Sequence, residues 1–239
     1  MISSKKTLEV IEDIIRRQLP ANEINIYGFA DLTGLLDPVF KGFNYGISIG
    51  QHLDNRILDK ITDGPTMQYY DHYRKVNEDL ASLSGRISED LNRNNIETCK
   101  ISPTVSTAEL DTIYNKTLRT ELSHKMVATR AGLGWIGKTD LLVTKEFGPR
   151  LRLTTILIKE MVRPKNKPIN RSRCGTCNIC VDSCPAKAAN GKVWNTTVDR
   201  DVYFDAQKCR NQCAKFGRER FSDGARVCGV CVAVCPVGQ

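Results

Sequence analysis

Apolar residues recur every three or four positions in three long segments of this chain, the spacing that gathers them on one face of a helix. The first helix is expected over residues 6–18, with Pro20 ending it. A longer helix is predicted over residues 69–92 and a third over residues 118–131. The buried stripe of the longest helix is expected to be Val76, Leu80, Leu83, Ile87 and Leu91.

Short runs of β-branched or alternating residues lie between these segments and predict strands. They cover residues 24–27, 45–49, 141–144 and 151–158. The turn-forming residues 147–149 join the last two runs. Strands interspersed with amphipathic helices in this way indicate a mixed α/β fold.

The cysteines are concentrated near the C-terminal end of the chain. Of the ten, nine lie between Cys174 and Cys235, and Cys99 stands apart as a small hydrophobic residue. The longer run is Cys174-x2-Cys177-x2-Cys180-x3-Cys184, followed by Pro185, and the shorter run is Cys228-x2-Cys231-x3-Cys235, followed by Pro236. Such spacing is typical of peptides that fold around 4Fe–4S clusters, which transfer single electrons.

In two-cluster ferredoxins the fourth cysteine of each run binds the other cluster. The same exchange assigns one cluster here to Cys174, Cys177, Cys180 and Cys235. It assigns the second cluster to Cys184, Cys209, Cys228 and Cys231. The choice of Cys209 is open, because Cys213 is a second candidate for the fourth position. Paired C-x2-C motifs also bind zinc, but the longer pattern occurs nearly twice and eight thiolates fit two clusters.

A segment with two prolines, residues 163–168, separates the helix-rich part of the chain from the cysteine-rich part. We therefore expect an α/β domain over residues 1–165 and a small two-cluster ferredoxin-like domain over residues 166–239. No apolar stretch approaches the ~20 residues that a membrane span needs, and the N-terminus lacks the apolar core of a secretion signal. We expect a cytoplasmic protein, where ten cysteines favour metal ligation over disulfides.

The chain is basic, with a formal net charge of +8. From residue 166 onward twelve Lys and Arg residues face six Asp and Glu residues. Such an excess could bind nucleic acid, but the stacking aromatic residues of single-strand binders do not accompany it. The anionic thiolates of two clusters offer another explanation, because nearby basic residues would offset their charge.

Glycines at positions 132, 134 and 137 match the G-x-G-x-x-G pattern of dinucleotide-binding proteins. That pattern requires a strand before it and a helix after it. Here a helical segment precedes the glycines and the strand-like residues 141–143 follow them. The context is inverted, so a nicotinamide site is excluded. A tight helix-to-strand turn, or close approach of the backbone to a large flat group, would explain the glycines.

With residues 131–138, followed by Leu141, Leu142 and Gly148 and then by two cysteine runs, the chain resembles the epoxyqueuosine reductase family, which is related to the reductive dehalogenases. Further similarity lies in residues 28–32, 47–50 and 204–209. The last of these segments ends at Cys209 and, through the resemblance, favours that residue as a cluster ligand. The resemblance covers most of the chain.

The resemblance implies a corrinoid-reductase-like first domain that holds a cobalamin next to the clusters. The residues that it places near the corrinoid are Tyr70, Gly132, Gly134, Trp135, Gly137 and Lys138. Electrons would come from an external donor such as a ferredoxin or flavodoxin and would pass through the clusters to the cobalamin and then to a substrate. The family needs no histidine ligand to cobalt.

Two features depart from the family pattern. The acidic residue expected one helix before the glycines is absent, and the nearest proton donors are Glu121 and His124. The chain also stops at Gln239, without the C-terminal extension that longer relatives use around transfer RNA. A related reductase with another substrate is therefore expected. The alternative is a ferredoxin-type electron carrier, or an accessory protein that reduces a partner's cofactor without catalysis of its own.

Overall fold

A computed structural model describes residues 4–19, 25–104 and 112–239. Its described residues fall into two compact units, each assembled from separate stretches of chain. The sheet unit contains residues 1–51, 76–133 and 152–169. The cysteine unit contains residues 52–75, 134–151 and 170–239. The division into domains at residue 165 stays a prediction, but residues 134–151 pack with the cysteine-rich segment.

A four-stranded sheet in the order β1-β2-β6-β3 forms the centre of the sheet unit. Strand β1 (Asn25–Asp31) pairs antiparallel with β2 (Tyr45–His52), with Gly28 opposite Ser48. Strand β3 (Thr98–Ile101) pairs antiparallel with β6 (Leu151–Ile158). The predicted strands at 45–49 and 151–158 are confirmed, as is the first strand from residue 25 onward; Ile24 lies outside the described residues. Strand β3 was not predicted.

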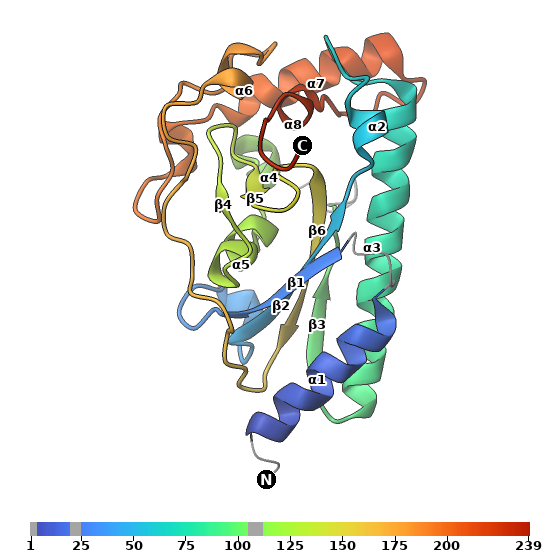
Figure 1. Cartoon of the computed structure of the whole chain (residues 1–239), viewed down its shortest axis with the longest axis vertical. Coiled ribbons are helices and arrows are strands. Elements are labelled where there is room, and N and C mark those ends of the chain that lie inside the picture. Colours follow the sequence, from blue (N-terminus) through green and yellow to red (C-terminus); the bar gives the residue numbers. More distant parts are fainter. Residues whose placement is uncertain (1–3, 20–24, 105–111) are drawn as a thin grey trace. The chain divides into compact units, whose positions relative to one another are not determined.

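Two long helices carry the amphipathic stripes that the sequence predicts. Helix α1 (Ser4–Gln18) and helix α3 (Met67–Arg93) confirm the first two predicted helices, and Pro20 lies outside the described residues. All five stripe residues of α3 are buried. The Gln18 amide donates a hydrogen bond of 2.7 Å to Asp90, so the C-terminal ends of α1 and α3 meet (Figure 1).

The predicted helix over residues 118–131 is wrong in its first half. Residues 112–117 form a separate short helix, α4 (Thr112–Thr117), and helix α5 covers only His124–Arg130. Leu118 has a φ of 52°, which no right-handed helix accommodates. The Ser123 hydroxyl then accepts a hydrogen bond from the Met126 N–H and starts α5 as its N-cap.

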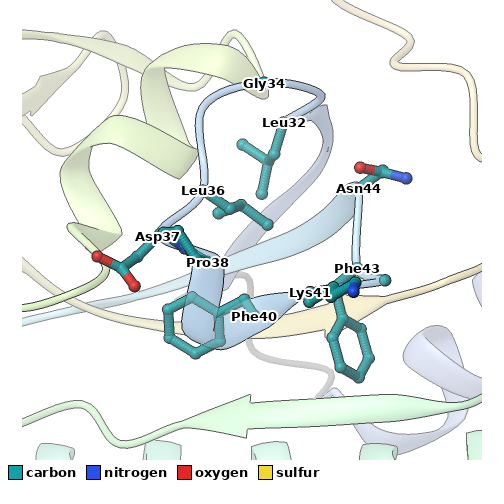
Figure 2. A pocket seen from close by; sticks show the side chains of 10 residues that line it. Leu32, Gly34, Leu36, Asp37, Pro38, Phe40, Lys41, Phe43 and Asn44 are labelled. Carbon is teal, nitrogen blue, oxygen red and sulfur yellow. The ribbon is translucent and has the colours of Figure 1, made fainter.

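Helix α5 packs against β1 through a small apolar core (Figure 1). The core consists of Ala30, Leu32, Leu122, Val127, Ala131 and Leu157. An open pocket of about 190 Å³ lies nearby, under the loop that joins β1 to β2, with Leu36, Phe40 and Lys41 among its lining residues (Figure 2). Ligand pockets for drug-sized molecules usually exceed ~300 Å³, and this pocket contains none of the predicted site residues.

The cysteine unit has a two-stranded sheet and several short helices. Strands β4 (Gly134–Ile136) and β5 (Leu142–Thr144) pair antiparallel, so the glycine motif contains a strand. The helices are α2 (Asn55–Leu58), α7 (Ala206–Arg220) and two that contact each other, α6 (Ile179–Asp182) and α8 (Val230–Ala233) (Figure 1). None of the helices in the described part of the chain combines the length and the apolar content that a membrane crossing requires.

Candidate functional site

All ten cysteines are free thiols, and nine of them lie in the cysteine unit. Cys174 and Cys177 come from the loop that leads into α6, Cys180 is in α6 itself, and Cys235 follows α8. Burial is the main cause that raises the pKa of Cys180 to about 11, and the neighbouring Cys235, Cys174 and Cys177 raise it further. Cys235 is affected in the same way by Cys174 and Cys177. These four thiols therefore form one electrostatic group.

A second group of thiols surrounds the start of α8. Burial raises the pKa of Cys228 to about 11, and Cys209 and Cys184 add to the increase. The pKa of Cys231 is raised, first by burial and then by Cys209 and Cys228. Cys213 also faces Cys228 and Cys231. The second group thus contains five thiols, one more than the four corners of a cluster require.

Each group receives a hydrogen bond from the chain at one of its sulfurs. The Trp135 indole N–H donates to the Cys174 sulfur at 3.4 Å, and the Ala188 backbone N–H donates to the Cys184 sulfur at 3.5 Å. Hydrogen bonds to ligand sulfurs help to set the reduction potential of an iron–sulfur cluster. Cluster iron binds thiolates, so this set of donors and sulfurs is chemically suited to 4Fe–4S ligation.

The Thr139 side chain lies between the two groups of thiols. It is buried, and its hydrogen bonding lowers the pKa of Cys180 in the first group and of Cys231 in the second. Cys180 in turn raises the pKa of Cys231. The two groups are therefore adjacent. Across the residues that the structure describes, no three His, Cys, Asp or Glu side chains are arranged to hold a single metal ion.

Arg150 is a buried cation beside the first group. Its guanidinium donates hydrogen bonds to Asn55 at 2.9 Å, to Asp59 at 2.8 Å and to the Ala233 carbonyl at 2.7 Å. Its positive charge opposes the upward shift in the pKa of Cys235. Sequence reasoning missed Arg150; the only signal was a charged residue at the start of an apolar strand.

The three glycines of the motif are required by the packing of the chain itself. A side chain at Gly132 would meet Asn166 and Lys167, and one at Gly134 would meet the Val143 carbonyl across the β4–β5 pair. The space beside Gly137 is bounded by Val143 and by the Cys174 sulfur. These glycines therefore allow a tight turn and close strand pairing, as the turn hypothesis requires.

The other residues that the resemblance associates with a corrinoid support the cysteine loops. The buried Lys138 ammonium donates a hydrogen bond of 2.7 Å to Asn178, which lies between Cys177 and Cys180. Trp135 binds Cys174, as described above. Tyr70 donates a 2.5 Å hydrogen bond to Asp223, five residues before Cys228. The groups through which these residues would hold a corrinoid are thus engaged by the chain, and their corrinoid role stays a prediction.

The two candidate proton donors lie in the sheet unit. Glu121 is exposed in the bend before α5. His124 is the first residue of α5, and its two ring nitrogens lie 2.8 Å from the Ser102 carbonyl and 2.8 Å from the Thr155 hydroxyl. Because a carbonyl only accepts, Nε2 carries the proton and Nδ1 accepts from the hydroxyl. Burial lowers the pKa of His124 to about 4, so the ring is neutral near pH 7.

The lowered pKa of His124 predicts that acid destabilises the sheet unit. In the unfolded chain the group has its ordinary pKa of 6.5, so between the two values the unfolded state binds the extra proton. The free energy of unfolding should fall by about 2 kcal/mol between about pH 7 and pH 5 on this account. Urea unfolding at both pH values measures this change, and the free energy of unfolding of His124→Gln should fall less than that of the wild type. An equal loss of stability in the wild type and in His124→Gln would contradict the assignment of the acid effect to His124.

Comparison with known proteins bears on the cysteine-rich segment first. Residues 173–238 match the family described as "4Fe-4S double cluster binding domain". That range includes both groups of thiols. The prediction of two 4Fe–4S clusters is thereby confirmed.

Two kinds of reductase are similar to this chain. The epoxyqueuosine reductase of Lactococcus garvieae is 35% identical over 120 residues, which are 47% of this chain and 31% of that protein. The solved structure of a reductive dehalogenase, described as suggesting a mechanism for B12-dependent dehalogenation, has a TM-score of 0.61 at 14% identity; the match covers 99% of this chain and 37% of that one. An epoxyqueuosine reductase solved with an epoxyqueuosine-modified tRNA stem loop has a TM-score of 0.58 at 19% identity. The match covers 99% of this chain and 66% of that one.

These comparisons confirm the mixed α/β fold and the resemblance to epoxyqueuosine reductases. The curated alignment spans less than a third of the reductase that it matches. The likeness to the solved structures concerns the fold, which many activities can share.

Proposed function

We propose that the chain is an iron–sulfur reductase of the epoxyqueuosine reductase-like kind, with two 4Fe–4S clusters that pass electrons one at a time. The observation that supports this most directly is the buried Thr139, which bonds to thiols of both groups. Adjacent clusters form a route for single electrons, which a pair of isolated structural sites would not need. The proposed compartment is the cytoplasm, where thiols stay reduced.

The proposed ligands of the first cluster are Cys174, Cys177, Cys180 and Cys235. The proposed ligands of the second are Cys184, Cys209, Cys228 and Cys231. Both sets agree with the electrostatic groups described above. Trp135 orients the Cys174 sulfur, and Lys138 fixes the loop between Cys177 and Cys180 through Asn178.

Arg150 contributes a fixed positive charge next to Cys235. A buried cation stabilises the more negative, reduced state of a nearby centre, since charges interact strongly where water is excluded. We therefore propose that Arg150 raises the reduction potential of the first cluster relative to one without this neighbour. An external donor such as a ferredoxin or flavodoxin would supply the electrons.

Cobalamin as the electron acceptor belongs to the same proposal, supported by the similarity to a B12-dependent dehalogenase. Bound cobalamin would supply a strongly reducing cobalt centre. The residues that the resemblance assigned to it are engaged by the chain itself. This engagement favours the alternative of an electron carrier or accessory protein. Glu121 is the proposed proton donor. Transfer RNA is a further candidate partner, because one similar structure was solved with a tRNA stem loop.

Addition of cob(II)alamin to the anaerobic protein separates the two functions. If the chain binds the corrinoid as a reductase would, the visible and electron paramagnetic resonance spectra should shift to the base-off form. An unchanged corrinoid spectrum would favour the electron carrier. Glu121→Gln should retain the shift and slow turnover about 10²-fold or more if the carboxyl group donates the proton. Lys125→Gln, in the neighbouring helix, is the matched control and should keep full activity.

A further inference from the structure

The second group of thiols contains five sulfurs, although a 4Fe–4S cluster takes four. Cys209 and Cys213 are the two that compete for one corner. They are four residues apart in α7, and this separation places both on the same face of the helix. Their side chains are hydrogen-bonded to each other, and Cys213 also faces Cys228 and Cys231. Cys213 is therefore in contact with the ligand set and is half-buried.

Position along α7 distinguishes the two thiols. The helix begins at Ala206 with Asp205 as its N-cap, so Cys209 lies at the end of the first turn and Cys213 lies a full turn further in. The positive end of a helix dipole acts within that first turn. The first turn therefore favours Cys209 as the anionic sulfur that binds iron, and a sulfur bound to iron has no proton to donate. In the bond between them Cys213 is the donor and the Cys209 sulfur accepts.

We propose that Cys213 is a positioning residue of the second cluster, whose S–H donates a hydrogen bond to the ligating Cys209 sulfur and raises the reduction potential of that cluster. The inference rests on the proposed function only in requiring the two clusters. A donor draws negative charge from the ligand sulfur, so the extra electron of the reduced state is better stabilised. Hydrogen bonds to the sulfurs are a known determinant of cluster potential.

Two substitutions at one position test the hydrogen bond. Cys213→Ala removes the donor, and Cys213→Ser replaces it with a hydroxyl donor of similar size. Iron and acid-labile sulfide are measured on the anaerobic protein, and a redox titration followed by electron paramagnetic resonance gives both midpoint potentials. Both variants should keep the full iron content. Cys213→Ala should shift one midpoint to a more negative value and leave the other unchanged, and Cys213→Ser should restore it.

The opposite outcomes overturn the proposal. Loss of about half of the iron in Cys213→Ala would make Cys213 the ligand, and Cys209→Ala would then retain both clusters. An unshifted midpoint in Cys213→Ala, or a shift that serine does not rescue, would mean that the hydrogen bond has no effect on the cluster. Cys99→Ala, in strand β3 of the sheet unit, is the control and should change neither iron content nor potential. If the corrinoid spectrum does not change in the cobalamin titration, the test of Cys213 is unaffected. A wild-type protein without two clusters would contradict both the proposed function and the proposed role of Cys213.

Discussion

Replacing Arg150 by methionine is expected to lower the free energy of unfolding of the cluster-loaded protein by about 3 kcal/mol. The arginine is buried, and its guanidinium donates to Asn55, Asp59 and the Ala233 carbonyl. A hydrogen bond to a charged group is worth about 1.5–3 kcal/mol, and a buried carbonyl left without its donor costs about 1–3 kcal/mol. The Asp59 side chain is 61% exposed and regains water, so its part of the loss is small.

The variant should affect the first cluster as well as the stability. The Ala233 carbonyl, which the guanidinium binds, closes α8 two residues before Cys235. Without the cation, the loop that carries this ligand loses an anchor and a neighbouring positive charge. The midpoint potential of the first cluster, which Cys235 is proposed to bind, should therefore become more negative.

Urea unfolding under anaerobic conditions measures the change in stability. Arg150→Lys is the conservative comparison and should fall between the two proteins, because one ammonium cannot reproduce three guanidinium bonds in fixed directions. Arg56→Met is the matched control: it changes the same residue type in α2, where the side chain is 89% exposed. Its effect should stay within about 0.5 kcal/mol. Equal stability of Arg150→Met and the wild type would show that the buried cation is not needed for folding.

The features that sequence analysis predicted correctly are those specified by neighbouring residues. Helix α3 follows from one apolar stripe, and strand β6 from one short run of aliphatic and β-branched residues. The double cluster follows from gaps of two and three residues, since a single loop must reach several irons of one cube. In each case the physical constraint acts within a few residues.

The features that sequence analysis missed depend on distant partners. Arg150 is buried because Asn55 and Ala233 provide acceptors, and neither is a neighbour in sequence. The helix start at Ser123 was missed because the apolar spacing continues upstream through residues that turn instead, with Leu118 at positive φ. The hydrogen-bond partner of Lys138, Asn178, likewise lies forty positions away in the sequence. No local pattern encodes these contacts.

Pairs of cysteine substitutions should reveal which thiols share a cluster. Cys174→Ala and Cys235→Ala are each expected to remove about half of the iron, about four atoms of about eight. If both residues bind the same cluster, the double variant loses no more than either single variant, because effects within one cooperative unit do not add. Cys174→Ala combined with Cys184→Ala should instead lose nearly all the iron, since those residues are assigned to different clusters.

The cross-assignment makes this experiment decisive, because sequence order alone would pair Cys174 with Cys184. Iron, acid-labile sulfide and zinc are measured on anaerobic preparations of each variant. Additive loss in the Cys174 and Cys235 pair would show that each run builds its own cluster, contrary to the electrostatic grouping of their thiols. Zinc without sulfide in the wild type would remove the clusters altogether. Cys99→Ala again serves as the control, because its thiol lies in β3 and its substitution should leave all the iron bound.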